Sequence, residues 1–345
     1  MTFDVFANPD FMEHDLVTFA RDRHSGLRAV IAIHDTHLGP ALGGCRIHPY
    51  ATEAAAVSDV LRLSRGMTFK AAIAGLPLGG GKSVILADPA TEKTPAMMRA
   101  MGRAVEALGG RYIVAEDVGA TVADMDEVAT QTRHVSGASG GTGDPSPWTA
   151  EGVFLCLETA VRRRFGQGLE GARVCVKGLG AVGWKLAERL HAAGARLTVA
   201  DVRAENAERA RAAFSAAVVA PAEAPQVAAE AFAPCALGAE LSSSTIPRLG
   251  APVVCGAANN QLATPADAER LRQRGVTYCP DYLVNAGGLI CVSRTAIALD
   301  EAAARERLAG LPAILETVLD RAEAEGRSSA EIADAMARER YMPAG

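Results

Sequence analysis

The segment RVCVKGLGAVGWKLAERLHAAGARLTVAD, residues 173–201, predicts a β-strand, a glycine-rich turn, an amphipathic helix and a second strand. The turn has the GxGxxG spacing of a dinucleotide-binding loop, at Gly178, Gly180 and Gly183. The first glycine allows the tight turn, the second lets backbone N–H groups approach a pyrophosphate, and the third allows close packing. Ala181 and Val182 begin the helix, whose N-terminus attracts phosphate groups. The segment therefore predicts a Rossmann-type domain, with a βαβ turn that binds no ligand as the alternative.

The acidic residue after the second strand indicates which dinucleotide this domain binds. Asp201 lies 18 residues beyond Gly183. A carboxylate there accepts the ribose hydroxyls of NAD and repels the 2′-phosphate of NADP, although Arg203 nearby weakens the discrimination. We therefore predict NAD as the cofactor. The string GGGKS at residues 79–83 ends like a phosphate-binding P-loop, but Leu76 stands where that motif requires glycine.

Helices and strands also alternate before this segment, so the chain is predicted to be an α/β protein of two domains. Leu16–Ala20 and Leu27–Ile33 are expected to pair as strands, and Thr52–Arg65 is expected to form a helix. A second helix is expected from Glu301 onward, with an interruption at Pro312.

The clearest change in composition is GASGGTGDPSP at residues 137–147, which is typical of a hinge. We expect an N-terminal α/β substrate domain over residues 1–136, a Rossmann-type NAD-binding domain over 137–322, and a cleft between the two domains. The helices in residues 323–345 are expected to pack back onto the first domain.

Composition excludes several classes of partner. The chain has 345 residues and a net charge of −5, so no electrostatic argument favours nucleic acid. It has no run of about twenty apolar residues and no signal peptide at its start, so we expect no membrane partner. Its seven cysteines lack CxxC spacing, which favours free thiols in a reducing cytoplasm. His34 and His37 have no third ligand at a suitable spacing, so no metal site is predicted.

The segment MTFKAAIAGLPLGGGKS, residues 67–83, contains two lysines, Lys70 and Lys82, and a glycine-rich turn just before the second. Two ammonium groups that converge on one pocket repel each other. The more buried one loses proton affinity, so one lysine is suited to hold an anion and the other is suited to act as a base near neutral pH. The alternative is a pair of solvated surface charges.

These motifs, and others in the same order along nearly the whole chain, resemble the glutamate, leucine, phenylalanine and valine dehydrogenases, and the leucine dehydrogenases most. The resemblance rests on GPALGGCRIHPY (39–50), RLSRGMTFKAAIAGLPLGGGKSVI (62–85), AEDVGATVADMD (115–126), GDPSPWTAEGV (143–153), KGLGAVG (177–183), APCALGA (233–239), CGAANNQL (255–262) and PDYLVNAGGLI (280–290). It implies NAD-dependent, reversible oxidative deamination of an L-amino acid to a 2-oxo acid and ammonia. It also implies a homo-oligomer.

The resemblance implies roles for individual residues. Lys70 and the backbone at Gly43 and Gly44 hold the substrate carboxylate. Lys82 activates the water that attacks the imine, and Asp117 moves protons to and from the amino group. A turn or helix cap is the alternative role for Asp117.

Three further residues have implied roles, Asn285 as part of the substrate site and the other two on the cofactor side. Asn285 orients substrate or cofactor, Thr149 bonds the nicotinamide amide, and Asn259 lies beside the nicotinamide ribose.

Substrate selectivity is predicted from the residues around these positions. Glutamate-specific relatives place a lysine where this chain has Leu42, and a serine where it has Val292. An acidic side chain would be buried without a partner, at a cost of several kcal/mol. With Ala115 and Leu289 these residues predict an apolar pocket for leucine, valine or isoleucine. Phenylalanine, valine or tryptophan dehydrogenase and a non-catalytic dinucleotide sensor are the alternatives.

Overall fold

The computed structural model describes residues 4–342 and divides the chain into two compact units. The first unit contains residues 4–143, 292–301 and 337–342, and the second contains Asp144–Cys291 and Ala302–Met336. The α/β class and the presence of two units agree with the prediction.

The first unit is built on a mixed sheet with the strand order β1-β2-β4-β3-β5. β1 pairs with β2, and β2 with β4, in antiparallel fashion, whereas β3 is parallel to both β4 and β5. The strands are β1 (Leu16–Asp22), β2 (Leu27–Asp35), β3 (Ala41–His48), β4 (Gly79–Leu86) and β5 (Tyr112–Glu116).

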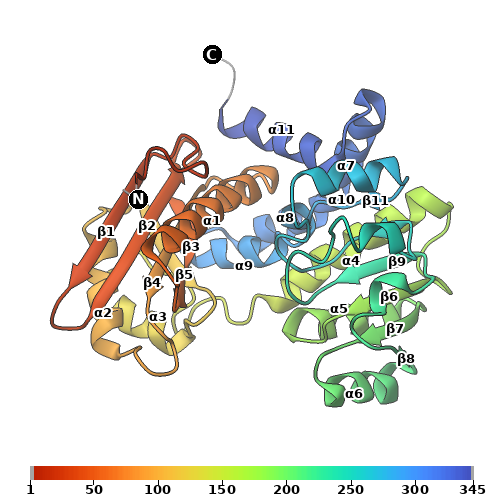
Figure 1. The fold of residues 1–345 in the computed structure, drawn as a ribbon, viewed down its shortest axis with the longest axis horizontal. Coiled ribbons are helices and arrows are strands. Elements are labelled where there is room, and N and C mark those ends of the chain that lie inside the picture. The colour runs from red at the N-terminus through yellow and green to blue at the C-terminus, as the bar shows by residue number, and fades with distance from the viewer. Residues whose placement is uncertain (1–3, 343–345) are drawn as a thin grey trace. The chain divides into compact units, whose positions relative to one another are not determined.

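Helices cover both faces of this sheet (Figure 1). On one face, α1 (Glu53–Ile73) packs Val57, Val60 and Leu61 against the apolar side chains of β2 and β4. On the other face, methionines and valines of α2 (Pro95–Glu106) and α3 (Val122–Ala129) form the larger core. The two faces of the sheet therefore carry different residues, in keeping with the period of two along each strand.

The second unit contains a six-stranded parallel sheet with the order β11-β10-β9-β6-β7-β8. The first strand in sequence, β6, thus lies between β7 and β9, which is the strand order of the Rossmann fold, with its topological switch point between β6 and β9. The strands are β6 (Arg173–Lys177), β7 (Arg196–Ala200), β8 (Ala217–Val218), β9 (Ala231–Pro234), β10 (Val253–Val254) and β11 (Thr277–Tyr278).

The helices of the second unit connect these strands and continue to the end of the described chain (Figure 1). They are α4 (Ser146–Phe165), α5 (Ala181–Ala192), α6 (Ala204–Phe214), α7 (Ala266–Gln273), α8 (Asp281–Val284), α9 (Gly287–Ala296), α10 (Glu301–Glu325) and α11 (Ser329–Tyr341). The unit boundaries at 291/292 and 336/337 fall inside α9 and α11.

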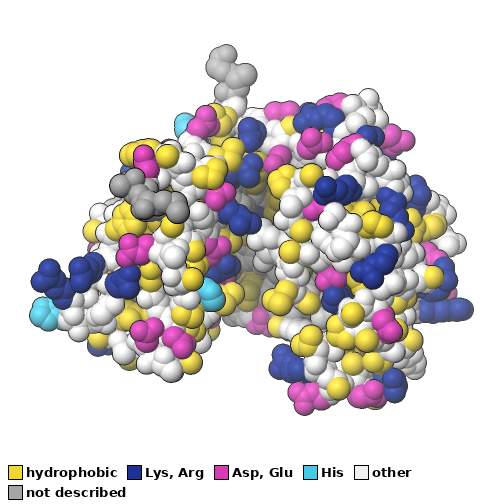
Figure 2. Space-filling view, viewed as in Figure 1, with side chains coloured by type: hydrophobic (Ala, Val, Ile, Leu, Met, Phe, Trp, Pro, Cys, Tyr) yellow, Lys and Arg dark blue, Asp and Glu magenta, His cyan; other side chains and the backbone are white. Residues whose placement is uncertain are grey.

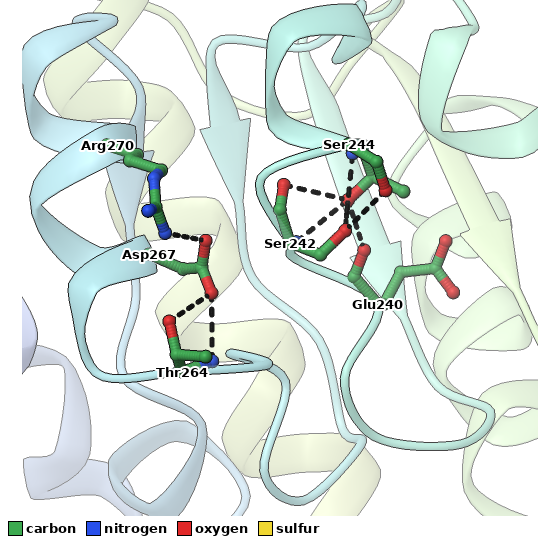
Figure 3. A network of polar contacts seen from close by, with 7 residues as sticks. Glu240, Ser242, Ser244, Thr264, Asp267 and Arg270 are labelled. Atoms are coloured by element: carbon green, nitrogen blue, oxygen red, sulfur yellow. Dashed lines mark hydrogen bonds and ion pairs between the residues drawn. The ribbon is translucent and has the colours of Figure 1, made fainter.

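Polar side chains fix the loops that follow β9 and β10 (Figure 3). Ser242 Oγ bonds Ser244 Oγ at 2.9 Å, and Asp267 Oδ2 accepts from the backbone and hydroxyl of Thr264 at the start of α7. Backbone hydrogen bonds, among them Leu241 N to Gln261 O at 2.9 Å and Ala263 N to Leu241 O at 2.8 Å, join the two loops. These contacts hold the carboxyl edge of the sheet in a fixed form.

Several predicted elements differ from the structure. The helix expected over Thr52–Arg65 runs to Ile73, so Lys70 lies on it. The interruption expected at Pro312 is wrong, because α10 continues through that residue with Leu308, Leu311 and Leu315 buried on one side.

The two units are also drawn differently from the expected domains. The first boundary falls at 143/144, residues 292–301 join the first unit, and residues 323–336 belong to the second. Of the helices expected to pack back, only residues 337–342 of the described chain lie in the first unit. The functional assignment of each domain stays a prediction.

Residues 4–342 contain neither a membrane-spanning helix nor a metal-binding cluster. No helix there has the length and apolarity needed to cross a bilayer, and no group of three or more His, Cys, Asp or Glu side chains is arranged to hold a metal. All seven cysteines are free thiols. Basic and acidic side chains are mixed over the face shown in Figure 2.

Candidate active site

The sheet of the first unit brings several predicted site residues to the face covered by α1. Val84 of β4 packs with α1, so Lys82, two residues earlier, lies on the same face. Parallel pairing sets Arg46 beside Val84 and Gly44 beside Ala115. Residues far apart in the sequence are thus placed on one side of three neighbouring strands.

The centre of this group is an ion pair between Lys82 and Asp117. Lys82 Nζ lies 3.0 Å from Asp117 Oδ2, and Lys82 is only 6% exposed. Burial raises the pKa of Asp117, but the charges and hydrogen bonds of Lys82 and Arg46 outweigh it and hold this pKa below its usual value. Asp117 is therefore an ionised carboxylate. It does not cap α3, whose N-cap is Thr121.

Lys70 lies on the last turn of α1, above the same strands. A side chain at Gly80 would collide with the backbone of Thr68, whose N atom would be 2.0 Å from the added carbon. The helix therefore rests directly on β4, with Lys70 two residues after Thr68 and Lys82 two residues after Gly80. The predicted pair of lysines comes from two elements in close contact.

Gly43 and Gly44 form the point where β3 approaches its neighbours most closely. A Cβ at Gly43 would lie 1.7 Å from the carbonyl oxygen of Gly81, and one at Gly44 would lie 2.7 Å from the Cβ of Asp117. Only glycine fits either position. The buried Tyr112 hydroxyl donates to the Gly43 carbonyl at 2.7 Å and fixes this backbone.

The structure also adds residues that the sequence reasoning missed. Arg46 Nε lies 2.9 Å from Asp117 Oδ2, and its Nη1 lies 3.0 Å from Asp59 Oδ2. Asp59 in turn accepts from the Tyr50 hydroxyl at 2.6 Å. The alternation along GGCR gave a signal for Arg46, because it puts residue 46 on the same face as Leu42 and Gly44.

The predicted apolar side chains are divided between the units. Leu42 is 1% exposed and Leu289 is 8% exposed. Leu42, Ala115 and Val292 belong to the first unit, whereas Leu289 belongs to the second. The Val292 carbonyl accepts from Ser136 Oγ at 3.4 Å.

The glycine turn of the second unit has the geometry of a dinucleotide loop. Gly178 has φ +99°, a Cβ at Gly183 would lie 1.9 Å from the Gly178 carbonyl oxygen, and the space around Gly180 is open to 4 Å. Gly178 thus makes the tight turn, Gly183 allows the close packing, and Gly180 leaves room for a ligand, as the motif requires. No side chain caps α5, which begins at Ala181, so its first N–H groups are suited to bind phosphate.

Asp201 stands after β7, beside this turn, and already has a structural role. Its carboxylate accepts from the backbone of Leu179 at 2.7 Å, from the backbone of Arg203 at 2.8 Å and from Asn206 Nδ2 at 3.3 Å. A carboxylate has about four acceptor sites, so room remains for a ribose hydroxyl.

Asn285 sits at the turn before α9 with one acceptor unused. Its Nδ2 donates to the Ala257 carbonyl at 3.1 Å and to Asn259 Oδ1 at 2.9 Å, while its Oδ1 is buried with no partner among the described residues. An orphan buried acceptor suits a ligand that donates. Gly288 allows Thr149 to lie against this turn, because a Cβ there would be 2.6 Å from Thr149 Oγ1.

A chain that contains a Rossmann-type unit and a second α/β unit with a buried lysine–aspartate pair has the features of an α/β dehydrogenase. The comparisons with known proteins identify the family. The Glu/Leu/Phe/Val dehydrogenase dimerisation domain matches residues 14–134, and the Glutamate/Leucine/Phenylalanine/Valine dehydrogenase domain matches residues 140–205 and 198–342. The chain belongs to this family of amino-acid dehydrogenases.

Individual relatives are similar over nearly their whole length. A leucine dehydrogenase from Thermoactinomyces intermedius is 46% identical over 338 residues, which is 96% of this chain and 92% of that protein. A valine dehydrogenase from Streptomyces virginiae is 45% identical, over 96% of this chain and 94% of its own. The crystal structure of an L-tryptophan dehydrogenase from Nostoc punctiforme has a TM-score of 0.84 and 41% identity, covering 95% of this chain and 96% of its own.

Proposed function

We propose that this chain catalyses the NAD-dependent, reversible oxidative deamination of an aliphatic L-amino acid, with leucine, valine or isoleucine as substrate. The products are the 2-oxo acid and ammonia. The observation that carries the proposal is the buried Lys82–Asp117 pair beside the Gly43–Gly44 backbone. Family membership supports the class of reaction, and the apolar residues that replace polar ones at positions 42 and 292 support the class of substrate.

The proposed binding mode uses the charges of the first unit. Lys70 and the backbone of Gly43 and Gly44 hold the substrate carboxylate. Asp117 faces the amino group, and its carboxylate stabilises the iminium that oxidation produces.

The proposed chemistry needs two proton acceptors. Asp117 takes a proton from the substrate ammonium, because the nitrogen must be neutral before Cα can be oxidised. A dinucleotide bound at the glycine turn would supply the acceptor for the hydride that leaves Cα. Lys82 Nζ takes one proton of the water that adds to the iminium carbon, which forms a carbinolamine. Asp117 returns its proton to the nitrogen. The C–N bond then breaks, ammonia leaves, and the hydroxyl proton passes to the Asp117 carboxylate as the 2-oxo group forms.

The side-chain pocket is assigned to Leu42, Ala115, Leu289 and Val292. These four side chains are hydrocarbon and offer neither a positive charge nor a hydrogen bond to a substrate carboxylate. Binding a glutamate side chain there is therefore disfavoured by several kcal/mol. One methylene changes selectivity by only about 10- to 200-fold, so phenylalanine and tryptophan remain the alternatives within the family.

The cofactor site is assigned to the glycine turn, Asp201, Asn285, Asn259 and Thr149. The open space at Gly180 and the orphan oxygen of Asn285 fit a dinucleotide. Asp201 supports NAD over NADP because its charge repels a 2′-phosphate.

We also infer a homo-oligomer in the cytoplasm. The N-terminal family domain is described as a dimerisation domain. In the first unit β1 is an edge strand, and its Phe19 is 58% exposed. The seven free thiols favour a reducing compartment.

A steady-state substrate profile tests the proposal. Reduction of NAD and of NADP is followed with leucine, valine, isoleucine, phenylalanine, tryptophan and glutamate. We expect the highest kcat/KM with a branched-chain amino acid and NAD. Highest activity on glutamate would overturn the pocket assignment, and tight NAD binding with no turnover on any amino acid would favour a dinucleotide sensor.

A further inference from the structure

A line of polar contacts leads from Tyr50 through Asp59 and Arg46 to the catalytic carboxylate. Tyr50 OH lies 2.6 Å from Asp59 Oδ2, Arg46 Nη1 lies 3.0 Å from the same oxygen, and Arg46 Nε lies 2.9 Å from Asp117 Oδ2. The side chains of Arg46, Asp59 and Asp117 are 25%, 27% and 21% exposed, so the line is largely shielded from water.

On this geometry we propose that Arg46 is a positioning residue, which fixes the orientation and the ionised state of Asp117 for catalysis and is itself fixed by Asp59. The proposal rests on the proposed function. Arg46 comes from β3, Asp59 from α1 and Asp117 from the end of β5, so the guanidinium joins three elements around the site. A planar fork can serve two carboxylates at once, whereas a lysine ammonium is a point charge on a flexible stem.

The first consequence concerns which oxygen of Asp117 meets the substrate. Arg46 Nε and Lys82 Nζ both contact Oδ2. Among residues 4–342, Oδ1 has no hydrogen-bond partner, and it is left to accept from the substrate amino group. Without Arg46 the carboxylate is free to rotate about its single contact with Lys82.

The second consequence concerns charge during the reaction. Lys82 must be neutral before it can accept a proton as a base, and in that state Asp117 keeps Arg46 as its cationic neighbour. Arg46 stays protonated at any working pH. It therefore limits the rise in the pKa of Asp117 in that state, so that the carboxyl group can still return to the nitrogen the proton that it took from the substrate.

Three other titratable side chains lie near Asp117, and none of them changes its charge in the pH range of the assay. Burial raises the pKa of Cys45 to about 12 and raises the pKa values of Tyr50 and Tyr112 above their usual range. All three are neutral below pH 9. Lys82 from β4 contacts Asp117 directly, Asp59 reaches it through Arg46, and Lys70 lies on the last turn of α1 above the same strands.

The test compares Arg46→Met, Arg46→Lys and Asp59→Asn in the full-length protein. The readout is the pH profile of kcat/KM for oxidation of leucine with NAD. In Arg46→Met we expect the midpoint of the acid limb to move to a pH about one unit higher. We also expect the plateau value of kcat/KM to fall about tenfold. Arg46→Lys keeps the charge, so it should restore most of the acid limb but not the plateau. Asp59→Asn leaves Arg46 in place and should show a smaller plateau loss.

The matched control is Arg99→Met. It removes an arginine–carboxylate pair between α2 and α3, Arg99 with Glu127, in the same unit. The control should leave the pH profile unchanged. A profile of Arg46→Met that matches the wild type would overturn the inference, and if that variant fails to fold, an unchanged profile in both Arg46→Lys and Asp59→Asn would do so.

Failure of the proposed function is distinguishable. If the wild type oxidises no amino acid, the proposed function falls, and the inference is then decided by the ¹³C titration of the Asp117 carboxyl, assigned by its loss in Asp117→Asn. A midpoint that rises by about one pH unit in Arg46→Met supports the role of Arg46. An unchanged midpoint overturns it.

Discussion

At the scale of single residues, Lys82 combines deep burial with a single ionic partner among residues 4–342. It lies in the middle of a sheet, and that partner is Asp117. A buried ion pair is expensive to form and contributes little to stability by itself. Its presence here is therefore better explained by chemistry than by folding.

We predict that Lys82→Met lowers kcat for amino-acid oxidation by about 10²- to 10⁴-fold, because the general base is removed. Asp117 keeps Arg46 as a partner, so the fold should survive. Stopped-flow and steady-state assays measure the loss of turnover, and thermal unfolding checks the fold.

The control for this substitution is Lys93→Met. Lys93 Nζ bonds Asp124 Oδ2 at 2.6 Å in the same unit, where the pair ties a loop to the start of α3. This variant should unfold at a lower temperature with kcat unchanged. Equal turnover in Lys82→Met and the wild type would remove Lys82 from the mechanism.

The sequence predicted Lys70, Lys82 and Asp117 because they stand in motifs that resemble a known family. It did not predict Arg46, because the contact between Arg46 and Asp117 depends on the order and register of β3, β4 and β5. An arginine in a strand is ordinary until the strand order places an acid across from it.

At the scale of elements, the unexpected length of α1 has a clear cause. The pattern ended at Arg65 because Gly66 and the β-branched Thr68 weaken a helix. In the structure the helix continues to Ile73, and Arg340 Nη1 donates to the carbonyls of Ala72 and Ile73 at 2.7 and 3.0 Å. A residue remote in sequence thus satisfies carbonyls that a helix end leaves free.

We predict that Arg340→Ala lowers the free energy of unfolding by about 1.5–3 kcal/mol, the usual range for hydrogen bonds from a charged donor. The last turn of α1 carries Lys70, so KM for the amino acid should rise more than kcat falls. Urea denaturation and substrate titration measure these effects. Arg272→Met, which removes an exposed pair with Glu269, should change neither by much.

His34 of β2 and His14, which precedes β1, are both buried against α1. Their rings lie 4.8 Å apart, and His34 Nδ1 bonds Thr68 Oγ1 at 2.9 Å. Burial, followed by repulsion from His14 and Arg65, lowers the pKa of His34 to about 3. Burial likewise lowers the pKa of His14.

A lowered pKa means that the unfolded chain binds protons more readily than the folded chain. The stability that neutral His34 provides is complete above pH 6.5 and is lost progressively as pH falls from 6.5 toward about 3. We predict a slope of up to about 1.4 kcal/mol per pH unit from this group. His34→Asn should flatten the dependence of stability on pH in that window, as measured by urea unfolding from pH 7 to 4.

His37 provides a control of opposite sign. Its hydrogen bond and ion pair with Asp35 raise its pKa. Its contribution is present below pH 6.5 and is lost as pH rises. His37→Asn should therefore leave the acid sensitivity of the wild type in place. If His34→Asn also keeps that sensitivity, the buried histidines are not its source.

At the scale of the whole molecule, the α/β class, the two units and the Rossmann-type unit were predictable, because they follow from local patterns. Alternating strands and helices and one GxGxxG turn are enough for that. The return of residues 292–301 and 337–342 to the first unit was not predictable with the right bounds. Nothing in the amphipathic pattern of α11 states which surface its last turns cover.

The contact between Arg340 and α1 has a consequence for synthesis of the protein. Arg340 is 268 positions from Ala72 and 267 positions from Ile73 in the chain. Ribosomes add about 5–20 residues per second, so the end of α1 waits on the order of tens of seconds for its guanidinium to be made. During that interval the last turn of α1, which carries Lys70, lacks the two hydrogen bonds from Arg340. A chaperone that binds exposed chain therefore has time to act on it before synthesis ends.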